Sequence, residues 1–374
     1  MSQDAEPFNS YHSRAMRGKT PLKQGLQTSY DGTKGGDGQM NSTEQAERTP
    51  AWGKAGRLVA VVVTHNRLDK LKPTIARLLD QPAPLLQAVV VVDNVSTDGT
   101  GEWLATLEDP RLVVQTSTGN IGGAGGFENG MKLAVQQFDP DWLVVMDDDA
   151  RPEPGALAAF HDLAPIQWDG IAAAVYFPDG QICEMNRPSR NPFWHGREFF
   201  RTMFGGGRSG FHLDPSAYEG AAQAIDVTSF VGFFISRAGV QRIGYPDGGL
   251  FLYGDDGLYT LGLRKAGGRI GFEPSVRFEH DCSTFGTHTQ RGRFVPLWKV
   301  YFYHRNLLLL YRMAAGWLFW PALAVVLPKW LLKTRAHAGQ RGLFLRLLGL
   351  AVWDGLRGHT ARSLDDVKQI SEPD

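Results

Sequence analysis

Residues 141–150 read Asp-Trp-Leu-Val-Val-Met-Asp-Asp-Asp-Ala, a short apolar run that ends in three carboxylates. The apolar part, residues 142–146, has the composition of a buried strand, and Asp147, Asp148 and Asp149 follow it directly. The next residues, Arg-Pro-Glu-Pro at 151–154, are expected to end the strand, because proline cannot donate to a sheet ladder. Alternation along a strand predicts that Asp147 and Asp149 point to the same side.

Three adjacent carboxylates repel one another, so full ionisation is costly without a counter-ion. A hard divalent cation with oxygen ligands is the natural partner for such a group. The alternative is a solvated acidic turn after an edge strand, and the three acids alone do not decide between the two.

The composition excludes several classes of protein. The chain has 374 residues, 43% of them hydrophobic, and a formal net charge of zero, so no overall field favours a nucleic-acid partner. Its two cysteines, Cys183 and Cys282, are too few and too far apart in sequence to predict a disulfide scaffold or a thiolate zinc site. We expect a reducing, cytoplasmic setting. No secretory signal is expected, and residues 1–56 are predicted to be a mostly disordered arm.

Two aliphatic runs flank a helical pattern at the start of the expected domain. Residues 58–63 and 87–92 are typical of buried parallel strands, and residues 68–80 between them have one apolar helical face. This order predicts a right-handed βαβ unit with its ligand loops at one edge of the sheet. Asp93, at the end of the second strand, is placed to accept hydrogen bonds from a nucleotide base or ribose, whereas Asp98 is predicted to cap a helix.

A glycine-rich turn follows a third short strand, residues 112–115. Residues 119–126 contain five glycines, and a helix is predicted to run on to about residue 138. Amides at the start of that helix would suit a phosphate. The spacing differs from the dinucleotide fingerprint, and the absence of a following Lys-Ser/Thr pair excludes a P-loop.

The motifs in this order strongly resemble those of family-2 glycosyltransferases of the GT-A fold. The resemblance rests on Val-Val-Val-Thr-His-Asn-Arg, Val-Val-Asp-Asn-Val-Ser-Thr-Asp-Gly-Thr, Gly-Asn-Ile-Gly-Gly-Ala-Gly-Gly-Phe and Met-Asp-Asp-Asp-Ala, and it covers residues 57–312. The glycine-rich segment resembles bacterial galactofuranosyltransferases in particular, with rhamnosyltransferases as near relatives. The resemblance implies an α/β fold with a Rossmann-like mixed sheet flanked by helices.

The resemblance also implies a catalytic base in the acidic pair Asp255-Asp256. The second acid, Asp256, would remove the proton of the acceptor hydroxyl. Asp255 would orient Asp256 or the acceptor. Without the resemblance, both acids would be interpreted as helix caps. His280 corresponds to the metal-binding histidine of the family and would complete a site with Asp149 and Asp147, a donor set that suits Mn²⁺ (or Mg²⁺). Asp281, His288 and His304 are alternative ligands, and Asp281 could instead fix the His280 ring.

The donor nucleotide sugar is expected to contact residues from all of these turns. Glu128 and Asn129 depart from the family pattern, which makes a basic contact to the donor phosphate there doubtful and favours Arg67 for that role. The expected contacts are Thr64, Arg67, Asp93, Asn120, Gly122, Gly123, Asp147 and Asp148.

The acceptor half is less regular. Residues 171–177, 224–236 and 269–272 are predicted strands, and residues 186–216 are predicted to be a long functional loop. Its aromatic residues could line an acceptor site by stacking on sugar or lipid, or could be local packing. They are Phe193, Trp194, His195 and Phe199.

The C-terminal region, residues 297–374, is predicted to be helical and associated with a membrane. Residues 316–332 form a 17-residue apolar stretch with prolines at 321 and 328, which is marginal for spanning a bilayer and better suited to an interfacial anchor. The alternative is a helical subdomain packed on the catalytic core or on a second subunit. Flanking basic residues that could meet anionic headgroups are Lys333, Arg335, Arg341 and Arg346.

These expectations describe an enzyme on the inner face of the cell membrane, with a catalytic domain at residues 57–296. It would be a metal-dependent inverting glycosyltransferase that moves galactofuranose from UDP-galactofuranose to a saccharide or polyprenyl-linked acceptor in cell-surface polysaccharide synthesis. A dTDP-rhamnose enzyme and a non-catalytic nucleotide-binding scaffold at the membrane are the alternatives. No nucleic-acid partner is expected, and a homo-oligomer is left open.

Overall fold

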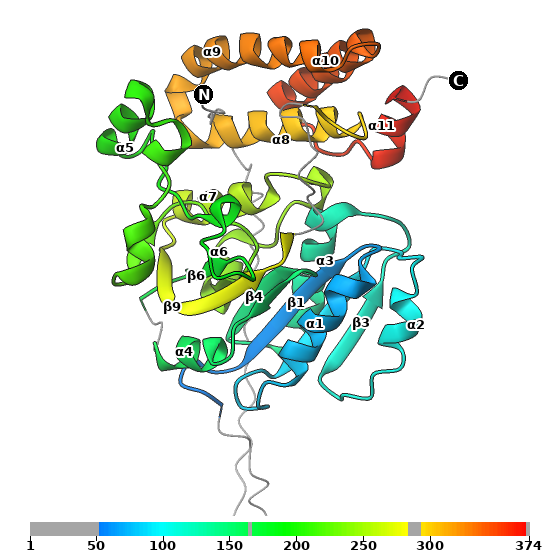
Figure 1. The fold of residues 1–374 in the computed structure, drawn as a ribbon, viewed down its shortest axis with the longest axis vertical. Coiled ribbons are helices and arrows are strands. Elements are labelled where there is room, and N and C mark those ends of the chain that lie inside the picture. Colours follow the sequence, from blue (N-terminus) through cyan, green and yellow to red (C-terminus); the bar gives the residue numbers. More distant parts are fainter. Residues whose placement is uncertain (1–51, 164–166, 283–292, 372–374) are drawn as a thin grey trace, which may run out of the picture.

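The strands in the described part of the chain form one mixed sheet of nine strands. A computed structural model describes residues 52–163, 167–282 and 293–371. The strand order is β3-β2-β1-β4-β8-β6-β9-β5, and β7 pairs with β9 beside this path. Helices lie on both sides of the sheet, and a separate helical layer covers one end (Figure 1). The mixed α/β sheet expected from the sequence is confirmed.

The first half of the sheet is parallel and follows the predicted elements closely. Each strand is followed by a helix or turn that leads to the next. The elements are β1 (Leu58–Thr64), α1 (Leu68–Leu79), β2 (Ala88–Asp93), α2 (Thr100–Leu104), β3 (Leu112–Thr116), α3 (Gly122–Phe138) and β4 (Trp142–Asp147).

Two cores lie on opposite faces of these strands, which explains the unbroken aliphatic runs. Val61 and Val63 pack with α3, whereas Ala60 and Val62 pack with α1. Successive side chains of a strand point to opposite faces, so a strand covered on both sides needs an apolar residue at every position.

The chain does not leave the sheet at residues 151–154, and this part of the prediction is wrong. Ala150–Pro152 forms β5, a three-residue strand antiparallel to β9. Pro152 is tolerated there because β5 is the last strand at the edge of the sheet, where a missing N–H costs no ladder bond. Asp148 and Asp149 therefore form a tight turn between two strands.

The predicted strand 224–236 is two strands with different partners. β7 (Gln223–Ile225) pairs with β9, whereas β8 (Phe233–Ser236) pairs with β4 and β6. Gly232 breaks the run with a φ of +67°, and a Cβ there would lie 2.7 Å from the Phe278 ring. The neighbouring elements are α4 (Ala156–Asp162), β6 (Gly170–Tyr176) and α6 (Arg237–Ile243).

The segment predicted as a long loop at 186–216 contains helical turns instead. These include η1 (Glu184–Asn186), α5 (Gly196–Arg201), η2 (Thr202–Gly206), η3 (Gly207–Gly210) and η4 (Pro215–Glu219). Beyond it lie η5 (Gly248–Leu250), α7 (Asp255–Lys265) and β9 (Ile270–His280). β9 is longer than the predicted strand 269–272, since it continues past a register shift opposite Ala173 and Ala174 and ends at His280.

The C-terminal helices form a layer with its own core. They are α8 (Lys299–Ala314), α9 (Phe319–Leu332), α10 (Arg341–Arg357) and α11 (Leu364–Ser371), with η7 (Gly316–Leu318) and η8 (Lys333–Ala336) between them. Figure 1 shows this layer above α7. Tyr301, Trp330 and Phe344 are buried in it together with Phe251 from the loop before α7. Within the described residues, none of the helices combines the length and the apolar character that crossing a membrane would require.

Candidate active site

The acidic turn and the end of β9 come together at one edge of the sheet. Ala150 is the Cα partner of His280 in the β5–β9 pair, and the Asp281 N–H donates to the Asp149 carbonyl at 2.9 Å. This pairing brings His280 Nε2 to 3.1 Å from Asp149 Oδ1 across 131 residues of chain. One ligand atom each from Asp147, Asp149 and His280 lies within 4.8 Å of the others. The structure thus brings the three expected metal ligands together.

Helix α1 holds the acidic turn in place from the other side. The Thr74 hydroxyl donates to the Asp148 carbonyl at 2.8 Å, and the Thr64 hydroxyl donates to Asp148 Oδ2 at 2.8 Å. Arg67, just before α1, pairs with Asp148 at 2.9 Å and Asp149 at 2.5 Å. Thr64, Arg67 and Asp148 were expected to contact the nucleotide, and here they bind one another; their contact with a donor stays a prediction.

The pKa values of the three carboxylates differ because their neighbouring side chains differ. Burial alone would raise the pKa of Asp149, but His280 and Arg67 outweigh it and hold that pKa below its ordinary value. Burial raises the pKa of Asp148 to about 6 in spite of Arg67. Burial, and then repulsion from Asp149, raises the pKa of Asp147 to about 7.

Asp147 is the carboxylate that lacks a counter-ion of its own. Within residues 52–163, 167–282 and 293–371, no hydrogen bond or direct ion pair reaches its side chain. A half-buried carboxylate that repels its neighbour and faces a histidine is a site at which a divalent cation relieves the repulsion. The donor set of two carboxylates and one imidazole therefore fits a divalent metal such as Mn²⁺.

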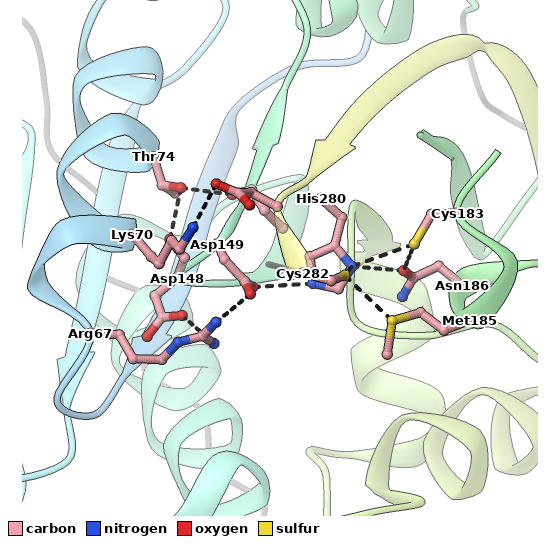
Figure 2. A network of polar contacts seen from close by, with 12 residues as sticks. Arg67, Lys70, Thr74, Asp148, Asp149, Cys183, Met185, Asn186, His280 and Cys282 are labelled. Atoms are coloured by element: carbon pink, nitrogen blue, oxygen red, sulfur yellow. Dashed lines mark hydrogen bonds and ion pairs between the residues drawn. The ribbon is translucent and has the colours of Figure 1, made fainter. Parts of the chain in front are cut away.

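Asn186, at the end of η1, orients the His280 ring. Asn186 Oδ1 lies 2.7 Å from His280 Nδ1, and its Nδ2 donates to the Ser229 hydroxyl at 2.8 Å. Because the amide oxygen can only accept, Nδ1 carries a proton that it donates to Asn186, while Nε2 faces Asp149 and would offer its lone pair to a metal at the acidic turn. Figure 2 shows His280 between Asp149 on one side and Asn186 on the other. No sequence spacing indicated Asn186, which lies 94 residues from His280.

The alternative ligands have other roles or lie elsewhere. The Asp281 carboxylate pairs with Lys70 Nζ at 2.7 Å, so the expectation that it fixes the His280 ring is not confirmed, and Asn186 takes that position. His304 is buried among the C-terminal helices and bonds to the Val300 carbonyl at 2.7 Å. His288 lies outside the described residues.

The two cysteines also meet at His280, although the sequence separation suggested that they could not act together. Cys282 Sγ lies 3.1 Å and Cys183 Sγ 3.9 Å from His280 Nδ1. The expectation that they are too far apart for a shared site is therefore wrong, because η1 and the end of β9 are neighbours in the fold.

The acidic pair Asp255-Asp256 begins α7 beside the acidic turn. Burial raises the pKa of both carboxylates, and repulsion from Asp256 and then from Asp147 adds to the rise for Asp255. The effect of Asp147 on Asp255 indicates that the two acidic groups lie near each other. Asp256 Oδ1 also accepts from the Gly257 N–H at 2.6 Å, so this acid contacts the helix start as well.

The loop before this pair is held by helix α8. Phe251, Tyr253 and Gly254 have positive φ values of 64°, 71° and 74°, which is unfavourable for the two aromatic residues. Asn306 Nδ2 donates to three carbonyls of the loop, those of Leu250, Leu252 and Tyr253, at 2.8–2.9 Å. The C-terminal layer therefore determines where Asp255 and Asp256 lie.

The glycine-rich turn brings backbone close to this same loop. A Cβ at Gly122 would lie 2.0 Å from the Phe251 carbonyl oxygen, so only glycine fits there, whereas Gly123 has open space around it. Asn120 Oδ1 accepts from the Gly122 N–H at 2.9 Å. Asp93 is buried at the end of β2, and one of its oxygens accepts from the Ser96 N–H at 3.0 Å. The contacts of these residues with a nucleotide sugar stay predictions.

Two further expectations concern residues outside this cluster. Asp98 lies one residue before Gly99, which is the N-cap of α2; its side chain accepts from the Thr100 N–H at 3.2 Å and from the Leu68 N–H at the start of α1, so it binds the start of both helices without being the N-cap. In the acceptor segment, His195 pairs with Asp226 at 2.7 Å, and Phe193 packs edge-on against Phe199. These contacts are local packing; they do not test a role in acceptor binding.

The comparisons with known proteins identify the class. Residues 59–217 match the description "Glycosyl transferase family 2". The chain is a glycosyltransferase with a family-2 domain. It resembles the galactofuranosyltransferases in particular: GlfT1 of Mycolicibacterium smegmatis is 27% identical over 234 residues, which are 60% of this chain and 71% of that protein.

Two further similarities cover other relatives. An undecaprenyl-phosphate mannosyltransferase of Micrococcus luteus is 30% identical over 155 residues, which are 40% of this chain and 60% of that protein. The crystal structure of S. aureus TarS 1–349 in complex with UDP-GlcNAc has a TM-score of 0.49 and 13% identity, over 84% of this chain and 90% of that one.

Proposed function

We propose that this glycosyltransferase has a GT-A catalytic domain and moves galactofuranose from UDP-galactofuranose to a saccharide or lipid-linked saccharide acceptor. The observation that carries the proposal is the meeting of Asp147, Asp149 and His280 within 4.8 Å, next to the acidic pair that starts α7. The similarity to galactofuranosyltransferases supports the choice of donor.

Each group of residues in the site would have a separate role in the reaction. Asp147, Asp149 and His280 would hold Mn²⁺ or Mg²⁺, which would neutralise charge on the diphosphate leaving group. Asp256 would take the proton of the acceptor hydroxyl, and its raised pKa makes it a stronger base than an exposed aspartate. Asp255 would orient Asp256 or the acceptor. Attack from the base side in a single displacement inverts the anomeric centre.

The proposal is tested by release of nucleotide from a panel of UDP- and dTDP-sugars, with Mn²⁺ and with EDTA. We expect slow, EDTA-sensitive release from UDP-galactofuranose. Faster release of nucleotide from dTDP-rhamnose than from UDP-galactofuranose would show that the protein is a rhamnosyltransferase instead. No binding and no release with any donor would contradict the enzyme proposal.

The Asp256→Asn variant tests the assigned base. We expect its transfer rate to fall by about 10²- to 10⁴-fold, because the acceptor proton has no carboxylate to receive it, while donor affinity stays the same. The matched control is Asp365→Asn, which removes one acid from the other acidic pair in the first turn of a helix, α11. Normal turnover in Asp256→Asn would remove the assignment.

We also infer that the C-terminal layer binds the inner face of the membrane, where a lipid-linked acceptor would lie. Trp317 and Trp320 are 82% and 62% exposed, and Trp353 on α10 is also exposed. Residues 282–353 contain ten basic and no acidic residues, which favours an anionic lipid surface. Exposed tryptophans among basic residues are typical of interfacial binding.

A further inference from the structure

A cluster of soft donor atoms lies on the side of His280 that faces away from the acidic turn. Figure 2 shows Cys183, Met185 and Cys282 grouped there. One ligand atom each from Cys183, Cys282 and His280 lies within 4.8 Å of the others. The chain has two cysteines in 374 residues, and the fold places both of them at this point.

The distances within the cluster are close to the range found around a tetrahedral metal, although none falls inside that range. Around a zinc ion with thiolate and imidazole ligands, neighbouring donor atoms are about 3.5–3.8 Å apart. Here His280 Nδ1 is 3.1 Å from Cys282 Sγ and 3.9 Å from Cys183 Sγ, and Cys282 Sγ is 3.4 Å from Met185 Sδ. The thioether of Met185 is thus placed as a fourth soft donor.

The two nitrogens of the His280 ring lie in two different metal-binding environments. Nε2 faces the carboxylates of Asp147 and Asp149, which suit a hard cation, whereas Nδ1 faces sulfur, which suits a soft one. A neutral imidazole has one lone pair for a metal. When Nδ1 binds a metal, the remaining proton is on Nε2 and is donated to Asp149.

We propose that Cys183, Cys282 and His280 Nδ1 form a second metal site for a soft cation such as Zn²⁺, with Met185 as fourth donor. Zinc binding would release both thiol protons and the Nδ1 proton and would break the hydrogen bond from Nδ1 to Asn186 Oδ1, so the ring would keep only its Nε2 proton. That tautomer cannot ligate a cation at the acidic turn, so zinc at the cysteines would oppose the metal used in transfer. The inhibitory part rests on the proposed function, whereas zinc binding itself does not.

The binding test uses the full chain after removal of metal and reduction of its thiols, with Co²⁺ as a coloured substitute for Zn²⁺. We expect one Co²⁺ per chain to give the near-ultraviolet absorption of a thiolate-to-cobalt transition and the visible bands of a tetrahedral ion, and Zn²⁺ to abolish both. Cys282→Ser should lose the thiolate absorption. Because Cys183 is fully buried, Cys282→Ser is the safer variant, and Cys183→Ser is the second.

The inhibition test measures nucleotide release at saturating Mn²⁺ with increasing Zn²⁺. We expect Zn²⁺ to inhibit Cys282→Ser at least tenfold less potently than the unaltered chain, while activity without zinc stays the same. Equal zinc inhibition of both proteins would mean that zinc acts at the acidic turn, and would overturn the inhibitory part.

The two tests separate this inference from the proposed function. An absent thiolate-to-cobalt absorption in a chain that still releases nucleotide would overturn the zinc site and leave the function intact. A normal thiolate-to-cobalt absorption in a chain that transfers no sugar would support the zinc site and contradict the proposed function. If the two thiols are found joined as a disulfide and bind no Co²⁺ after reduction, the proposal also fails.

Discussion

At the residue scale, Asn186 decides which nitrogen of His280 faces the acidic turn. Its amide oxygen accepts from Nδ1, and the amide nitrogen is itself held by Ser229. The partner of a metal-binding histidine is commonly worth about 10- to 100-fold in metal affinity. Asn186 is therefore a positioning residue for the proposed metal site.

Asn186→Leu is expected to weaken Mn²⁺ binding by about 10- to 100-fold, because the ring is no longer held with Nε2 toward the carboxylates. Electron paramagnetic resonance of free Mn²⁺ measures the affinity directly. Asn186→Asp keeps an accepting oxygen and should bind Mn²⁺ nearly as well as the unaltered chain. Unchanged affinity in Asn186→Leu would show that the ring is held by other contacts.

The acidic pair should make stability depend on pH. The folded state raises the pKa of Asp255 from 3.8 to about 8, so this group favours folding most below its ordinary pKa and loses that contribution as the pH rises to about 8. Removing the charge should therefore stabilise the protein at high pH and have little effect at low pH.

Asp255→Asn is expected to raise the free energy of unfolding on the order of 1–2 kcal/mol near pH 8, a value that allows for solvent screening of a half-buried group, and by less near pH 4. Denaturant unfolding with EDTA at the two pH values measures the difference. Asp365→Asn, in the first turn of α11, serves as the control and should show no such trend. An equal effect at both pH values would contradict the raised pKa.

At the scale of elements, α8 determines the geometry of the loop that carries the acidic pair. Arg305 is fully buried, and its Nη2 donates to the carbonyls of Gly249 and Leu250 at 2.8 and 3.0 Å. Together with Asn306, it holds a loop whose aromatic residues adopt unfavourable backbone angles. Loss of either side chain leaves buried carbonyl groups without donors.

Arg305→Met is expected to cost about 2–5 kcal/mol of stability and to lower the transfer rate at least tenfold, because the base moves with its loop. The matched control is Arg312→Met on the same helix, since Arg312 donates to the Leu356 carbonyl within the C-terminal layer and not to the loop. The control should lose stability but keep its rate per folded molecule. Equal transfer rates per folded molecule in both variants would show that the contacts of Arg305 with the loop do not affect catalysis.

At the scale of the whole molecule, the C-terminal layer presents an apolar and basic surface. Five large apolar residues of η7 and α9 are exposed, namely Trp317, Trp320, Val325, Leu331 and Leu332. Their burial in a lipid interface would contribute about 1.5–3 kcal/mol for each large side chain. This contribution supports the proposed binding of the C-terminal layer to a membrane.

A Trp317→Ser and Trp320→Ser double variant is expected to bind anionic vesicles tenfold more weakly or worse, as measured by sedimentation, because two interfacial rings are lost. Val114→Ser, at an exposed position on β3, is the control and should bind normally. Binding of the unaltered chain should weaken with salt. No binding to any vesicle would favour a helical layer that packs on another subunit.

The amino-acid sequence by itself determined the parallel strands, the helix boundaries near them and the acidic residues of the proposed metal site. These features follow from local rules: aliphatic runs, helical periodicity and polar residues at strand ends. The predicted same-side placement of Asp147 and Asp149 is consistent with their convergence on His280.

Only the tertiary structure decided how distant segments meet. The β5–β9 register sets His280 against Asp149, the turn at Gly232 divides a single apolar run between two partners, and η1 brings Cys183 and Asn186 to the histidine. Pairing and register depend on contacts between segments about 100 residues apart, for which a single sequence carries no local signal. The acids of the site could therefore be read from the chain and His280 was inferred from the family resemblance, whereas the partners that orient them could not be predicted.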